Sequence, residues 1–258
     1  MNRYPIYIPS KGRWDKTLTA NMFDKENIFY FVVIVEDEKE KYQERFESKN
    51  LLILPPENTG WLSGSRNWIK NHATESGFKF HWQFDDDIRK IKKIDKKKTV
   101  KCSTLEALQE IENLVDQYQN IGISGIRNAC FPDFKKSLKI NQMAYCCVLV
   151  NNKNQFEWRG GKGIEDWQHE DTDYSIQVLS MGLCTVLINY YVFESANIGT
   201  NAGGCFEKYT FDKRIKGIRK LQKKWPNLGI DITMRNGVPR PKTAHVWRKF
   251  KTPLKKHE

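Results

Sequence analysis

The stretch Phe80-His81-Trp82-Gln83-Phe84-Asp85-Asp86-Asp87 joins an aromatic segment to three consecutive aspartates. Phe80, Trp82 and Phe84 alternate with polar residues, which predicts a β-strand with one aromatic face. Open α/β sheets bind ligands just beyond the carboxyl ends of their strands. We therefore expect an α/β fold with a ligand site at the three aspartates.

The aspartates themselves indicate what that ligand is. Three adjacent carboxylates repel one another unless a cation lies among them. Hard divalent ions such as Mg2+ and Mn2+ prefer carboxylate oxygens and keep coordination positions open for substrate phosphates. The alternative is an exposed acidic turn that caps a helix, and the aspartates alone do not separate the two.

Apolar runs that alternate with helical patterns surround this strand, which indicates an α/β domain. Further strands are expected at residues 4–8, 28–35, 51–54, 121–126, 143–150 and 185–193. Helices are expected at residues 15–23, 63–77, 174–181 and 213–224, in a charged segment that ends near residue 46, and after a capping box formed by Ser103 and Glu106. No linker divides the chain, so the sequence predicts one domain over residues 1–258 that ends in a Pro-, Gly- and Lys-rich tail.

Polar residues follow the first two predicted strands. Pro9, Ser10 and Arg13 lie in the turn after the first strand, where a turn can contact a base or a ribose. Glu36 and Asp37 end the second strand, where a carboxylate can accept a hydrogen bond from a ribose hydroxyl. Both positions fit a nucleotide site.

Gly60, Arg66 and Asn67 open the helix that precedes the aspartates. Arg66 at a helix start could face a phosphate, or it could pair with a structural carboxylate. Asn67 could contact the ligand or simply tie a loop. Later in the chain, a glycine-rich stretch at residues 159–163 leads to His169-Glu170-Asp171, which begins a predicted helix.

The positive charge is concentrated in two segments. The formal net charge is +12, yet residues 208–258 hold sixteen Lys and Arg against three acidic residues, so the rest of the chain has a net charge of −1. Eight more basic residues surround Asp95 between Arg89 and Lys101. Such concentration predicts a polyanionic partner, because Lys and Arg release counterions from phosphates. A solubilising surface and an anionic membrane are the alternatives.

In their order, these motifs resemble the GT-A glycosyltransferases, which transfer sugars from nucleotide-sugar donors. The resemblance rests on Ile8, Pro9 and Arg13, the acidic end of the second strand, Gly60 with Arg66-Asn67, and the Asp-x-Asp of Asp85 and Asp87. It implies a Rossmann-like mixed, mainly parallel central sheet flanked by helices, here with a basic C-terminal extension. It also implies a nucleotide-sugar half over residues 1–101, an acceptor half over 102–207 and a basic segment over 208–258.

More narrowly, the chain is similar to the phage-type TET-associated glycosyltransferases. Tyr7 to Arg13, Trp61 to Asn67 and Gln83 to Asp87 carry this similarity. It implies a UDP-sugar donor, Mn2+ or Mg2+, and DNA with a hydroxymethylated pyrimidine as acceptor. A GT-A enzyme that acts on a glycan, lipid or protein is the alternative, and a non-catalytic nucleic-acid-binding protein is a third reading.

The resemblance also implies roles for particular residues. Asp87, with Asp85 and His245, would bind the metal, and Asp86 would contact the ribose or orient the metal. Glu170 and Asp171 would be the acidic pair near the acceptor, with Asp171 as the base of an inverting transfer or a positioning group in a retaining one. The competing acidic pair is Glu165-Asp166. His245 could equally be a surface or core histidine.

DNA contacts are expected from the basic segments, at Lys92, Lys93, Lys96, Lys97, Lys98, Lys223 and Lys224. The chain has no apolar run long enough to span a membrane, no signal-peptide pattern in its first residues and no CxxC pair among its six cysteines. We therefore expect a cytoplasmic protein, in the host cytoplasm if a phage encodes it.

Overall fold

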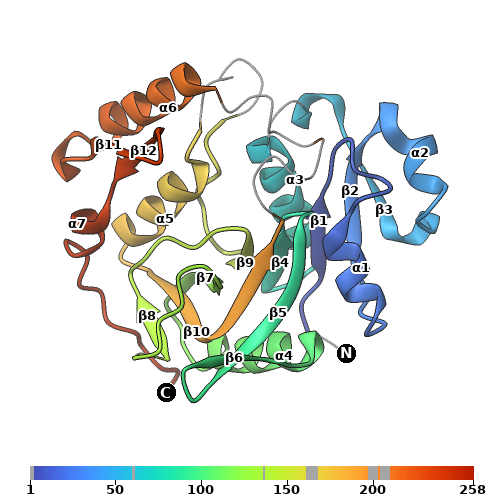
Figure 1. Cartoon of the computed structure of the whole chain (residues 1–258), viewed down its shortest axis with the longest axis horizontal. Helices are drawn as coiled ribbons and strands as arrows, with labels where there is room; N and C mark the ends of the chain where they lie inside the picture. Colours follow the sequence, from blue (N-terminus) through green and yellow to red (C-terminus); the bar gives the residue numbers. More distant parts are fainter. Residues whose placement is uncertain (1–2, 60–61, 136, 161–167, 197–202, 204–209) are drawn as a thin grey trace.

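The structure, a computed structural model, describes residues 3–59, 62–135, 137–160, 168–196, 203 and 210–258 (Figure 1). Within these residues, a mixed sheet of ten strands has helices on both of its faces. This arrangement confirms the predicted α/β class and the GT-A-like architecture. None of the helices in the described ranges has the length and apolar character that crossing a membrane requires.

The first half of the sheet is parallel and Rossmann-like. Its strands lie in the order β3 (Leu51–Leu54), β2 (Phe31–Val35), β1 (Ile6–Pro9) and β4 (Phe80–Phe84). The connections contain α1 (Leu18–Asp24), α2 (Lys39–Gln43), α3 (Leu62–Glu75) and the short 3-10 helices η1 (Glu36–Glu38), η2 (Ser48–Asn50) and η3 (Pro56–Asn58). Parallel neighbours place the carboxyl ends of β1, β2 and β4 at one edge of the sheet.

The second half of the sheet is mostly antiparallel. Beyond β4, the order continues with β9 (Cys147–Asn151), β7 (Ile121–Asn128), β10 (Cys184–Ser195), β5 (Ile88–Asp95) and β6 (Lys98–Lys101), while β8 (Leu138–Ile140) also pairs with β10. Only β7 and β10 are parallel in this half. The hairpin of β5 and β6 is absent from the sequence-based expectation, and it carries the chain from the three aspartates toward the opposite edge of the sheet (Figure 1).

Alternate side chains of the strands fill two core layers. Ile6 and Ile8 of β1 pack with α1, α2 and α4 (Thr104–Val115), whereas Tyr7 packs with α3 on the other face. Ser103 caps α4 by accepting from the Glu106 amide at 3.2 Å, as the capping box predicts. In β4 all five residues are buried, and Phe80, Trp82 and Phe84 lie in one core layer, which confirms the predicted aromatic face. His81 and Gln83 are inside because they hydrogen-bond each other at 2.8 Å.

The last part of the chain packs against α5 (Glu170–Ser180). It comprises α6 (Phe211–Lys224), the 3-10 helix η5 (Pro226–Leu228), the hairpin of β11 (Asp231–Arg235) and β12 (Val238–Lys242), and α7 (Ala244–Trp247). Ile176 and Leu179 of α5 share a hydrophobic cluster with Leu221, Ile230 and Trp247. The expected tail after α6 therefore contains a hairpin and a helix that join a small core.

Candidate active site

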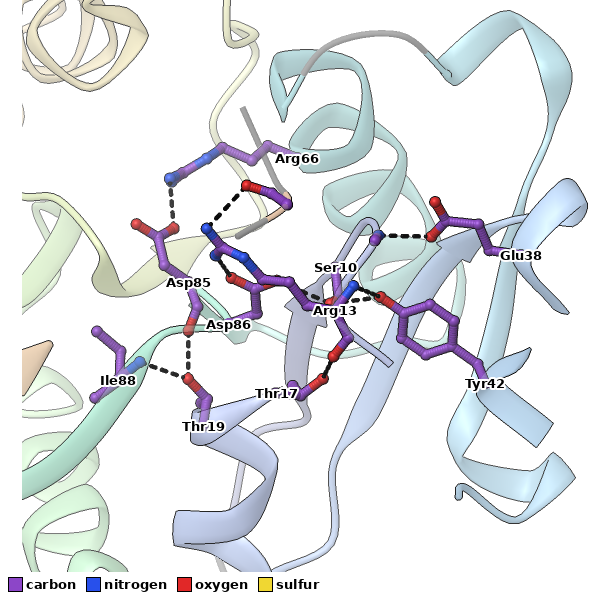
Figure 2. A network of polar contacts seen from close by, with 12 residues as sticks. Ser10, Arg13, Thr17, Thr19, Glu38, Tyr42, Arg66, Asp85, Asp86 and Ile88 are labelled. Atoms are coloured by element: carbon purple, nitrogen blue, oxygen red, sulfur yellow. Dashed lines mark hydrogen bonds and ion pairs between the residues drawn. The ribbon is translucent and has the colours of Figure 1, made fainter. Parts of the chain in front are cut away.

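The three aspartates lie at the carboxyl end of β4, and the backbone around them is fixed by Thr19 (Figure 2). The Thr19 hydroxyl donates to the Asp85 carbonyl at 2.5 Å and accepts from the Ile88 amide at 2.9 Å, while the Thr19 amide donates to the Asp86 carbonyl at 3.3 Å. Thr19 is fully buried in the first turn of α1. No local pattern indicates this role, because a threonine at a helix start is common.

Two more backbone bonds tie the turn to the second half of the sheet. The Asp85 amide donates to the Cys146 carbonyl at 2.8 Å, and the Ala196 amide donates to the Asp87 carbonyl at 2.9 Å. Cys146 has a positive φ of 62° just before β9, and Ala196 follows β10. The acidic turn is therefore held by segments from both halves of the fold.

The side chain of Asp86 points toward the turn after β1 (Figure 2). Ser10 Oγ donates to Asp86 Oδ2 at 2.8 Å, and the Arg13 guanidinium forms an ion pair with Asp86 Oδ1. Ser10 Oγ also contacts the Tyr42 hydroxyl at 2.8 Å. Burial raises the pKa of Asp86, and Arg13 opposes that rise. In this structure Asp86, Ser10 and Arg13 hold one another, so both of the Asp86 oxygens already have partners.

Arg66 connects the aspartate turn to the start of α5. Only 2% of its side chain is exposed, and its two terminal nitrogens lie 3.1 Å from Asp85 Oδ1 and 3.3 Å from Asp171 Oδ1. Its guanidinium also lies 5.7 Å from the ring centroid of Trp158. Of the two readings of Arg66, the structure therefore favours the structural pair: the guanidinium bridges two carboxylates and is not exposed to a phosphate.

Glu170 and Asp171 begin α5, where the free amides and the helix dipole favour negative charge. Burial raises the pKa of both carboxyl groups, and Arg66 opposes the rise. Burial also raises the pKa of Asp85 to about 7, and Arg66 again opposes it. The structure thus brings together Asp85, Asp171 and Glu170, which are far apart in the sequence. A carboxyl group such as that of Asp85 can exchange protons near neutral pH.

Asp87 is half-buried and differs from its two neighbours. Within the described part of the chain, its carboxylate forms no ion pair and no hydrogen bond with the side chain of another residue. Burial and the adjacent Asp86 charge raise its pKa, and the more distant charge of Arg13 opposes the rise only in part. The oxygens of Asp87 are available to a divalent ion.

A metal ion at this turn would find few protein ligands. Within the described ranges, no three His, Cys, Asp or Glu side chains are grouped to hold an ion. Mg2+ commonly binds through one or two carboxylates and takes its remaining ligands from water and substrate phosphates. Asp87 fits this mode. The structure does not bring His245 to the turn: its Nε2 contacts the carbonyls of Leu228 and Gly229 at 3.1 and 2.8 Å. Its helix, α7, is on the side of the molecule away from β1 (Figure 1).

Several other predicted residues have structural partners or lie elsewhere. Both amide atoms of Asn67 bond the Trp158 backbone at 2.8 Å, so Asn67 ties a loop. Glu36 and Asp37 are exposed in η1, and it is Glu38, a residue missing from the prediction, that accepts from the Gly12 amide at 2.9 Å. Pro9 is buried in β1. Gly60 and the competing pair Glu165-Asp166 lie outside the described residues.

The predicted DNA-binding lysines fall into two separate groups. Lys92 pairs with Glu194 at 2.6 Å, and Lys93 pairs with Glu110 at 3.4 Å. Lys96, Lys97 and Lys98 lie at the tip of the β5–β6 hairpin, beyond β5, which itself spans roughly 24 Å from Ile88 to Asp95 at about 3.4 Å per residue. Lys223 and Lys224 are exposed at the end of α6. The lysines that follow the aspartates in the sequence therefore lie on a hairpin that extends away from the site.

Comparison with known families gives a match to most of the chain. A family model described as TET-Associated Glycosyltransferase matches residues 4–204, which include β1, the aspartate turn and α5. The match confirms the resemblance drawn from the motifs. A search of curated proteins found no match.

Proposed function

This chain belongs to the TET-associated glycosyltransferase family, and from that premise we propose that it transfers a sugar from a UDP-sugar to the hydroxyl of a hydroxymethylated pyrimidine in DNA, with the help of a divalent metal. The observation that carries the proposal is that two carboxylates with different surroundings lie at one edge of the sheet. Asp87 has an open carboxylate for a cation, and Arg66 holds Asp171 beside the same turn.

Asp87 supports the donor side of the proposal. A bound Mn2+ or Mg2+ would neutralise the charge that develops on the nucleoside diphosphate as it leaves. Asp87 would be the ligand from this turn, with phosphate and water completing the coordination. Asp85 would orient the turn through Arg66, because one of its oxygens is already bound there.

Asp171 supports the acceptor side. The bond between the anomeric carbon and the diphosphate oxygen breaks, and a bond forms between that carbon and the acceptor oxygen. In an inverting transfer the acceptor proton passes to Asp171, whose side chain is 23% exposed and whose pKa is raised by burial. In a retaining transfer the same carboxylate positions the acceptor. Glu170 is more deeply buried, so it supports Asp171 and does not contact the acceptor.

The proposal is tested by incubating the protein with Mn2+, a panel of nucleotide sugars, and DNA with or without hydroxymethylated pyrimidines. The digested nucleosides are then examined by mass spectrometry, and sugar is expected on the modified base alone. Donor hydrolysis without labelled DNA would favour a glycan, lipid or protein acceptor. No donor turnover and no metal-dependent nucleotide binding would favour a non-catalytic protein.

Asp87→Asn tests the metal assignment. We expect turnover to fall by about 100-fold or more, because a charge-stabilising group at the leaving group is removed. Mn2+ with UDP should raise the melting temperature of the unmodified protein and should not raise that of the variant. Glu75→Gln, at an exposed position at the end of α3, is the matched control and should behave like the unmodified protein. Full activity of Asp87→Asn would remove Asp87 from the metal site.

A further inference from the structure

The segment after residue 210 forms a basic arm, which we define as residues 211–242 and which comprises α6, η5, β11 and β12. It lies beyond residues 4–204, where the family match ends. Ten Lys and Arg and only two acidic residues fall in this arm. Figure 1 shows it above α5, on the side of the molecule away from the β5–β6 hairpin.

The arm is fixed to the start of α5 by close packing. A Cβ at Gly217 of α6 would lie 3.0 Å from Gln168 Cβ and 3.2 Å from the Gln168 amide nitrogen, so glycine allows the helix to pack closely here and a larger residue would push Gln168 away. Trp225 Nε1 donates to Asp173 Oδ1 in α5 at 2.8 Å. The arm therefore has a defined position beside Glu170 and Asp171.

Two arginines of the arm lie near the acidic pair. Burial, together with the charges of Arg214 on α6 and Arg240 on β12, lowers the pKa of His169 to about 4. His169 directly precedes Glu170 in the chain, and its left-handed backbone starts α5. Positive charge from the arm thus reaches the acceptor side of the site.

The outer face of α6 presents a row of cations. Lys216, Arg219, Lys223 and Lys224 are exposed, and Lys216, Arg219 and Lys223 recur at the three- and four-residue spacing of one helix face. None of these four forms an ion pair with an acidic side chain in the part of the chain that the structure describes. By contrast, Lys92 and Lys93 of β5 are both paired.

The hairpin of the arm has an aromatic contact of its own. The Arg235 guanidinium of β11 lies 4.9 Å from the ring centroid of Phe131, which is 44% exposed in the loop after β7. Exposed rings beside cations are typical of surfaces on which bases stack. Phosphate-binding cations and a ring for stacking are features of nucleic-acid surfaces, and a membrane surface offers no bases to stack.

We propose that the basic arm binds the phosphate backbone of the acceptor DNA and so presents the modified base to Asp171. This inference rests on the proposed DNA acceptor. It assigns DNA binding to α6 and the β11–β12 hairpin, and it leaves the β5–β6 hairpin away from the DNA.

The test compares two variants that each lose four positive charges. The arm variant carries Lys216→Gln, Arg219→Gln, Lys223→Gln and Lys224→Gln, and the hairpin variant carries Lys96→Gln, Lys97→Gln, Lys98→Gln and Lys101→Gln. Glutamine keeps the helix propensity of lysine and arginine, so α6 should still fold. Binding of a short labelled duplex with 5-hydroxymethylcytosine is measured by fluorescence anisotropy over a range of KCl concentrations.

The arm variant should bind DNA at least about tenfold more weakly. Its salt slope should fall by about 0.9 for each phosphate that the variant no longer neutralises, or about 3 to 4 in total. It should keep the unmodified rate of UDP-sugar hydrolysis. The hairpin variant should bind like the unmodified protein. A second arm variant, Arg240→Gln with Lys242→Gln, should weaken binding while leaving α6 unchanged.

Two results would overturn the assignment: unchanged DNA affinity and salt slope in the arm variant, or a larger loss in the hairpin variant. Loss of binding only to phosphatidylserine vesicles would also overturn it, in favour of a membrane surface. If the unmodified protein turns over no donor while the arm variant still binds DNA more weakly, the arm assignment stands and the proposed function fails.

Discussion

Arg66→Met tests whether the buried guanidinium holds the carboxylates of the site together. Methionine keeps much of the length of the side chain and removes its charge. Arg66 is 2% exposed and bridges Asp85 and Asp171, so the variant leaves two carboxylates without their cation. Removing one partner of a buried ion pair typically costs about 3–5 kcal/mol. We expect a loss of that size in the free energy of unfolding at pH 7.

The loss should shrink as the pH falls. Without Arg66, each carboxyl group can become neutral in the folded state, which costs about 1.4 kcal/mol for every pH unit above its unfolded pKa of about 3.9. That cost is about 4 kcal/mol per carboxyl at pH 7 and about 1.5 kcal/mol at pH 5. A folded pKa above the unfolded value means that stability is lost as the pH rises. The pKa values of Asp85 and Asp171 are already raised in the unmodified protein, so part of this pH dependence is common to both proteins. Between pH 7 and pH 5 the variant should therefore recover stability relative to the unmodified protein, by less than the difference of about 2.5 kcal/mol per carboxyl between these two costs.

Urea unfolding followed by tryptophan fluorescence at the two pH values measures both quantities. Arg3→Met is the matched control, because Arg3 pairs with Asp116 at the surface with 53% of its side chain exposed. Such a pair contributes at most about 1 kcal/mol. A loss below about 1 kcal/mol for Arg66→Met at pH 7, or the same loss at pH 5, would refute the bridging role.

Two further changes probe the core beside the site. His81 is buried with Nε2 2.8 Å from Gln83, and burial lowers its pKa to about 3, so its share of stability is lost as the pH falls below about 6.5. Between pH 7 and pH 5, the free energy of unfolding of His81→Gln should fall by about 2 kcal/mol less than that of the unmodified protein, as measured by urea unfolding. An equal fall in both proteins would contradict a neutral His81 in the folded state. Thr19→Val should lower the free energy of unfolding by about 1–3 kcal/mol, because the buried Ile88 amide loses its acceptor. Thr74→Val is the control, because the Thr74 hydroxyl bonds a carbonyl within its own helix. Equal losses in the two variants would show that the hydrogen bonds of Thr19 to the acidic turn do not stabilise the fold more than an ordinary helix hydroxyl does.

The strands of the parallel half can be predicted because their signals are local. Buried apolar runs indicate β2 and β3, and the aspartates mark the end of β4. The β5 strand escapes prediction because Ile88, Ile91 and Ile94 recur at every third residue, which is not a strand period. The strand forms there because it pairs with β10, whose register shifts between Glu194 and Ser195.

The β11–β12 hairpin does carry a local signal. Asn236-Gly237, both with positive φ, is a typical two-residue hairpin turn. Two prolines in β12, Pro239 and Pro241, obscure it because proline is rare in paired strands.

Partners within the site are harder to predict than its members. The sequence points to Asp85 and Asp171, but nothing local indicates that one buried arginine contacts both. The alternative uses of Arg66 and Asn67 cannot be separated without knowing where Trp158 lies. Such contacts join residues about a hundred positions apart, so they depend on the folded topology and not on any local pattern.

The backbone bonds of the acidic turn determine how much of the chain must be synthesised before the turn can form. Asp85 needs the carbonyl of Cys146, and Asp87 needs the amide of Ala196. A nascent chain that has left the ribosome only as far as β6 has all three aspartates but neither of these partners. Long-range pairings of this kind form late, after the intervening chain is available. The nascent protein therefore cannot complete the backbone bonds of the acidic turn until the second half of the sheet is in place.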